Sequence, residues 1–80
     1  VSRMDHVKPA EYDMVRLRRP LPDHGLAAGA QGTVVMDHTK YAGPDLPPAY
    51  EVEFTDGEGR TEAVVTVPEE YLEVIQRPRP

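Results

Sequence analysis

Hydrophobic and polar residues alternate with a period of two along most of the chain, and no sustained helical stripe is present. The clearest alternation is in Tyr50–Thr55, where Tyr50, Val52 and Phe54 are separated by glutamates. A period of two is typical of a strand with one face on the core and the other in water. We therefore expect Tyr50, Val52 and Phe54 to lie in the core of a β-sheet.

Other segments have the alternation or the β-branched composition of strands. They are Tyr12–Arg18, Gln31–His38, Thr61–Val67 and Leu72–Ile75. In the first of them, Asp13, Val15 and Leu17 share one side. The glycines of Asp56–Gly59 allow the positive φ of a hairpin turn, and Pro68–Tyr71 predicts a single 3₁₀ turn that begins at proline.

Together these elements predict an all-β fold, a small five-stranded SH3-like barrel with one 3₁₀ turn before the last strand. The alternative, a small helical bundle, is disfavoured by nine prolines and by the missing helical stripe. A chain of 80 residues is long enough for one such domain and too short for a second core. We expect a mobile N-terminal arm over 1–10, the barrel over 11–75 and a mobile C-terminal tail over 76–80.

Composition narrows the range of chemistry. The chain has no cysteine, which excludes disulfides, thiolate nucleophiles and cysteine-based metal sites. The apolar runs are short and no signal peptide is recognisable, so we expect a cytoplasmic location. The net charge of -5 argues against nucleic-acid binding, because basic surface supplies most of the affinity for phosphates.

Glycines at positions 25, 29 and 32 form a loop that could suggest phosphate binding. A P-loop needs a Gly-Lys-Ser/Thr sequence and a helix behind it, whereas Gly32 is followed by the strand residues Thr33 and Val34. We expect instead that at least one of Gly29 and Gly32 has positive φ or lies where a Cβ would clash.

Candidates for catalysis and metal binding are weak. The only serine, Ser2, is in the N-terminal arm, so no Ser-His pair is expected on a rigid element. Glu51 and Glu53 share one strand face, where carboxylates usually keep a sheet soluble. The three histidines are widely spaced, without the spacing of a ligand pair. They are His6, His24 and His38. We therefore expect no enzyme activity, no cofactor and no metal.

Three motifs carry a resemblance to a known family. Gly29-x-x-Gly32-x-Val34 is followed by Tyr50-x-Val52-x-Phe54, and the chain closes with Tyr71-Leu72-Glu73-Val74. In this order the chain, from about Tyr12 to Ile75, resembles an uncharacterised family of small bacterial SH3-like domains. Members of that family are described as domains of unknown function, so the resemblance implies a fold and little chemistry.

A weaker likeness is to the C-terminal SH3-like domain of the nitrile hydratase β subunit and to its activator proteins. It rests on Val15-Arg16, Pro22-Asp23-His24, the Gly29–Val34 segment, Tyr50–Phe54 and Tyr71-Leu72-Glu73. The tryptophans of that family's late segment are missing here. The likeness implies an accessory or maturation factor of a nitrile hydratase-type metalloenzyme.

The long loop Thr39–Pro48 is the candidate interaction site, because long loops in compact domains are often functional. Tyr41 and Leu46 give it aromatic and apolar content. We expect it to converge with the basic cluster of the first strand on one partner-binding surface. The predicted surface consists of Arg16, Arg18, Arg19, Tyr41 and Leu46.

Two alternatives remain for these residues. The loop could be an insertion without function, and the arginines could pair with Asp13, Asp23 or Glu73 of their own surface. The leading hypothesis is a non-enzymatic protein-interaction module, such as an accessory subunit, an immunity or antitoxin-type partner, or a regulator of a neighbouring protein. The nitrile hydratase-type accessory factor is the alternative, and nucleic-acid binding comes third.

Overall fold

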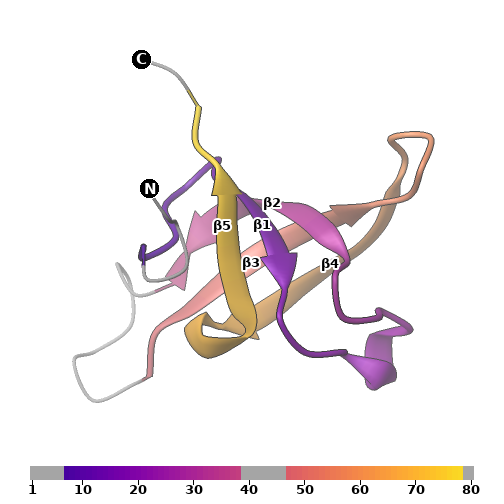
Figure 1. Cartoon of the computed structure of the whole chain (residues 1–80), viewed down its shortest axis with the longest axis horizontal. Coiled ribbons are helices and arrows are strands. Elements are labelled where there is room, and N and C mark those ends of the chain that lie inside the picture. Colours follow the sequence, from indigo (N-terminus) through magenta and orange to yellow (C-terminus); the bar gives the residue numbers. More distant parts are fainter. Residues whose placement is uncertain (1–6, 39–46, 79–80) are drawn as a thin grey trace.

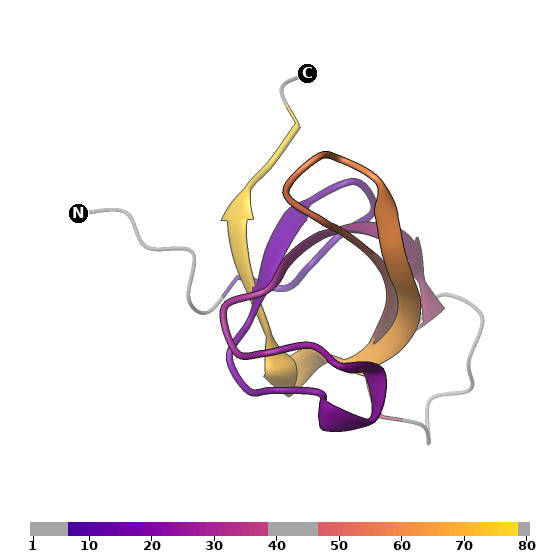
Figure 2. The same cartoon turned by 90° about the vertical axis from the view of Figure 1, so that its right-hand side faces the viewer.

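Five antiparallel strands form one curled sheet in the computed structural model, which describes residues 7–38 and 47–78. The strands are β1 (Met14–Leu17), β2 (Gln31–Asp37), β3 (Ala49–Thr55), β4 (Thr61–Pro68) and β5 (Leu72–Gln76). Their order in the sheet is β4-β3-β2-β1-β5, so β4 and β5 are its edges. The strands cross one another in Figure 1 and surround a common interior in the view of Figure 2.

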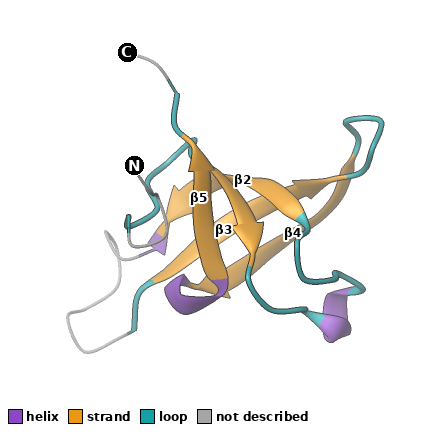
Figure 3. Cartoon of the chain, in the orientation of Figure 1, coloured by secondary structure: helices purple, strands orange, loops and turns teal. Residues whose placement is uncertain are grey.

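A 3₁₀ turn, η3 (Glu69–Tyr71), lies immediately before β5. Pro68 precedes it as the N-cap residue. The all-β class, the five strands and the turn before the last strand are thereby confirmed (Figure 3). In the described part of the chain, no helix has the length and apolar character to cross a membrane.

Another 3₁₀ turn, η1 (Pro22–His24), was not predicted from the sequence. Its first residue is a proline, whose fixed φ favours such a start. Gly25 ends the turn in the left-handed region at φ 68° and donates its N–H to Pro22 O at 3.1 Å. The proline and the glycine were therefore the available sequence signals for η1.

The core is made by the alternating residues of the strands. Tyr50, Val52 and Phe54 are buried, as the alternation of β3 predicts, and Asp13, Val15 and Leu17 share the buried side near β1. The buried apolar residues are Val15, Leu17, Leu26, Val34, Tyr50, Val52, Phe54, Val65, Val67, Leu72 and Val74. They come from all five strands and one loop, so every strand depends on the others for its burial.

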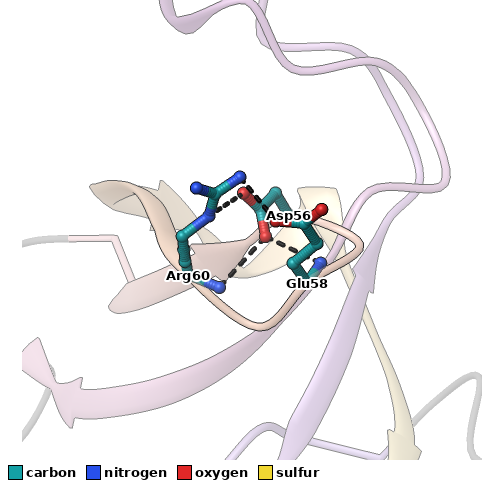
Figure 4. Close-up of polar contacts among 3 residues, drawn as sticks. All are labelled: Asp56, Glu58 and Arg60. Atoms are coloured by element: carbon teal, nitrogen blue, oxygen red, sulfur yellow. Dashed lines mark hydrogen bonds and ion pairs between the residues drawn. The ribbon is translucent and has the colours of Figure 1, made fainter.

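Asp56 fixes the hairpin turn between β3 and β4 (Figure 4). Its carboxylate accepts hydrogen bonds from the backbone N–H groups of Glu58 at 2.8 Å and Arg60 at 3.0 Å. These bonds hold the pKa of the Asp56 carboxyl below its usual value, and the bond from Arg60 has the larger effect. Gly59 has φ 83°, which confirms the positive φ expected in the turn.

Contacts at the two ends of the domain extend beyond the expected range 11–75. The carboxylate of Asp13, 2% exposed, accepts hydrogen bonds from Ala10 N at 2.9 Å and from Arg77 Nε at 3.2 Å. Arg77 also donates to Lys8 O at 2.6 Å. A buried carboxylate needs such partners, and here they come from segments expected to be mobile. Ala10 and Arg77 thus bond to Asp13, and Lys8 bonds to Arg77, while the expected domain bounds stay a prediction.

Replacing Phe54 by alanine should lower the free energy of unfolding by about 3–5 kcal/mol, because a large buried side chain leaves a cavity. Phe54 is 1% exposed in the centre of the core. A domain of this size has little more stability to lose, so Phe54→Ala should be largely unfolded in urea concentrations that wild type tolerates. Melting within a degree or two of wild type would contradict the described core.

Alanine at Gly32 should destabilise the domain more than alanine at Gly29. A Cβ at Gly32 would lie 2.6 Å from Glu53 O, a backbone atom that cannot move away alone, and overpacking of this kind costs about 1–3 kcal/mol. Gly29 has open space but φ 91°, so alanine there should cost about 1–2 kcal/mol. Both glycines thus meet the expectation from the sequence. Gly57→Ala, with open space and no positive φ, is the matched control, and equal losses in all three variants would refute this account.

Candidate functional site

The arginine cluster begins on β1 with Arg16, which pairs with a carboxylate of its own sheet. Arg16 and Glu73 are opposite each other in the register of β1 and β5. The Arg16 guanidinium donates to Glu73 Oε1 from Nη2 at 2.5 Å and from Nε at 3.0 Å. The alternative that these arginines pair within their own surface is therefore realised at Arg16. An exposed pair of this kind contributes only about 0–1 kcal/mol.

Arg18 and Arg19 follow β1 and contact the two residues before Glu73, which are Leu72 and Tyr71. Arg18 Nε donates to the carbonyl oxygen of Leu72 at 3.1 Å. The Arg19 guanidinium lies over the ring of Tyr71, with 5.4 Å between Cζ and the ring centroid, within the range of a cation–π interaction. The three arginines thus contact three consecutive residues, 71 to 73.

Pro47 and Pro48, the part of the long loop that the structure describes, contact the turn η3 just before these residues. Pro48 O accepts a hydrogen bond from Glu69 N at 3.1 Å. Pro47 and Pro48 line a shallow pocket of about 190 Å³ together with Pro68, Glu69 and Glu70. Pro48 and Arg19 therefore both contact η3, which Figure 1 shows as the gold turn between β4 and β5.

This surface is called the η3 rim below. It consists of Arg18, Arg19, Pro47, Pro48 and Tyr71. The predicted residues Arg16, Arg18 and Arg19 lie in it or beside it, whereas Tyr41 and Leu46 lie outside the described residues. Tyr71 was not predicted as a site residue, although the sequence predicted the 3₁₀ turn Pro68–Tyr71 that contains it. Pro47 and Pro48 belong to the predicted interaction loop Thr39–Pro48.

Tyr50 anchors η3 to the sheet. The phenol is buried beneath the turn and donates a hydrogen bond to Glu69 Oε1 at 2.9 Å. Burial, this hydrogen bond and the negative charge of Glu69 all raise the pKa of Tyr50 above its ordinary value of 10.0. The sequence placed Tyr50 in the core, but it gave no sign that its hydroxyl would hold the turn.

The other candidates from the sequence have structural explanations. The glycine loop leads into strand β2 and not into a helix, so no helix N-terminus stands behind it. Glu53 accepts a hydrogen bond from Thr61 Oγ1 at 2.7 Å, and His38 Nε2 lies 3.7 Å from Glu51 Oε1. Within residues 7–38 and 47–78, no three His, Asp or Glu side chains are grouped to hold a metal ion.

The buried phenol of Tyr50 should make the domain lose stability at alkaline pH. The pKa of Tyr50 in the folded state is raised above 10.0, so the unfolded chain loses this proton at a lower pH than the folded chain does. The contribution of Tyr50 to the free energy of unfolding is therefore complete below pH 10 and falls as the pH rises further. Tyr50→Phe removes one hydrogen bond and should cost about 1 kcal/mol at neutral pH. In urea unfolding, the gap between wild type and Tyr50→Phe should shrink above pH 10. A difference in stability between wild type and Tyr50→Phe that stays constant to pH 11 would contradict the buried Tyr50–Glu69 bond. The control is Tyr12→Phe, because the Tyr12 side chain is exposed.

Comparison with known proteins identifies a family without a known activity. No significant match was found among curated proteins or among solved structures. One family model, described as a domain of unknown function, DUF4926, matches residues 11–74. The matched range includes all five strands up to the middle of β5, the arginine cluster and η3. The chain therefore belongs to the DUF4926 family.

Proposed function

We propose that the domain is a non-enzymatic protein-interaction module that binds an acidic partner at the η3 rim. The observation that carries the proposal is the position of η3, which contacts Arg19 on one side and Pro48 on the other. A surface of arginine, tyrosine and proline has the residues that interfaces favour. The Tyr71 ring and the guanidinium above it provide a rigid, partly apolar anchor.

The distribution of charge supports an acidic partner. Residues 14–20 contain three arginines and no acidic residue, whereas residues 49–71 contain seven acidic residues and only Arg60 as a base. Charge of one sign gathered on one surface steers partners of the opposite sign and sets specificity more than affinity. Glu69 and Glu70 of η3 carry negative charge at the Pro47 and Pro48 side of the rim, so the carboxylates of a partner segment would meet Arg18 and Arg19 at the other side.

The roles that fit this surface are an accessory subunit, an immunity or antitoxin-type partner, or a regulator of a neighbouring protein. The SH3-like identity of the barrel is part of the proposal, supported by the position of β1 between β2 and β5 and by the 3₁₀ turn before β5. The nitrile hydratase-type accessory role and the cytoplasmic location stay predictions from the sequence.

The test is affinity capture from the native host, followed by titration of the captured protein with purified variants. Arg18→Glu and Arg19→Glu should each weaken binding about tenfold, equivalent to about 1.4 kcal/mol, while the melting temperature stays near that of wild type. Arg60→Glu is the matched control, because it changes the net charge equally but lies in the β3–β4 turn, at the other end of β3 from η3. Tyr41→Ala tests the predicted loop in the same assay.

Two results would refute the η3 rim as the binding surface. One is wild-type affinity in both rim variants. The other is an equal loss in Arg60→Glu, which would show that net charge alone governs binding. A gel shift with nucleic acid at moderate salt would overturn the choice of a protein partner.

A further inference from the structure

Apolar side chains are exposed at the opposite end of β1 from the η3 rim. Among the described residues, the large apolar side chains exposed to solvent are Tyr12, Met14, Val35, Met36 and Val64. The first four occupy adjacent backbone positions, since Tyr12 N donates to Val34 O at 2.7 Å and Met14 is opposite Thr33 in the register. These four residues, Tyr12, Met14, Val35 and Met36, are called the β1–β2 patch.

A β-bulge in β2 is responsible for two of them. Val34 is opposite Val52 of β3, and Met36 is opposite Glu51, so Val35 is an extra residue between two pairs. A bulge of this kind redirects side chains. Here Val34 is buried, while the next two apolar residues both face solvent. Regular alternation would have turned one of them to the core.

A second irregularity exposes Tyr12. It has φ 74°, the one positive value among the described residues other than glycine, and its side chain is 65% exposed. L-residues with a large side chain rarely adopt this conformation, and such residues persist only where the surroundings hold them. Asp13 holds this one through its bonds to Ala10 N and Arg77 Nε.

An acidic stripe borders the β1–β2 patch along β3. Glu51 is opposite Met36 and Glu53 is opposite Thr33, so both carboxylates lie beside the exposed residues of β2. A second copy of this chain would bring the same stripe against itself, at a net charge of -5 for each copy. The charge instead favours a partner with basic residues next to its apolar ones.

We propose that the β1–β2 patch is a second interaction surface, which binds an extended protein segment that presents apolar and basic residues on the same side. The apolar residues pack on Tyr12, Met14 and Met36, and the lysines or arginines lie over Glu51 and Glu53. Tyrosine supplies large contact area at low entropic cost, and methionine adapts to the shape of a partner. The surface is separate from the η3 rim and has the opposite charge preference.

The test uses a short synthetic peptide with a repeat of two leucines and two lysines, which places both residue types on each side of an extended chain. The control peptide has glutamate in place of lysine. Titration into isotope-labelled protein should shift the backbone amide signals of residues 12–14, 33–36 and 51–53, and the glutamate peptide should leave them unchanged. Tyr12→Gly is the decisive variant. Glycine adopts φ 74° without strain, so the variant should melt no lower than wild type yet bind the lysine peptide about tenfold more weakly.

Met36→Ser should weaken binding to a similar extent, whereas Val64→Ser is the matched control. Val64 is 53% exposed on β4, opposite Glu53, but three strands away from Met14. The proposal is overturned if Tyr12→Gly and Met36→Ser bind like wild type, if Val64→Ser loses as much, or if the shifted signals lie at the η3 rim. It is also overturned if sedimentation shows a dimer that Met36→Ser dissociates, since a second copy would then cover the patch.

Discussion

The close approach of β2 and β3 at Gly32 is the constraint on which the curled sheet depends. A Cβ at Gly32 would lie 2.6 Å from the backbone oxygen of Glu53 and 2.8 Å from Val52 Cγ1. Glycine inside a strand often marks such an approach. Because β2 is the central strand, with β1 on one side and β3 on the other, this contact sets how tightly the two halves of the sheet close over Phe54.

The alternation of the sequence was sufficient to predict the strands and most of the core. In β3, Tyr50, Val52 and Phe54 alternate with polar residues. A strand with one buried face must turn these three side chains to the core, because a slip of one residue would expose all of them. The Ala63-Val64-Val65 run of β4 carries no such information, because three consecutive apolar residues fit either face. Only the pairing with β3 shows that Val64 faces solvent and Val65 the core.

The features that sequence reasoning missed depend on contacts between distant segments. Asp13 and Arg77 are separated by most of the chain, and only the pairing of β1 with β5 brings them together. The left-handed Tyr12 has no local signal, because the usual residues for that conformation are glycine and asparagine. The sequence identified the arginines of the candidate site, but their contacts with residues 71–73 follow from the same strand pairing.

The short strand β1 joins the two proposed surfaces, and the charges around them differ in sign. At its C-terminal end the arginines lie against residues 71–73, and at its N-terminal end the β1–β2 patch borders Glu51 and Glu53. Arg16 lies between these ends, and its pair with Glu73 lowers the positive charge that would otherwise extend toward Met14. A segment that suits one end therefore carries the wrong charge for the other. If both proposed surfaces bind partners, this separation on one small barrel would distinguish the two partners by charge, although each surface offers only a few side chains.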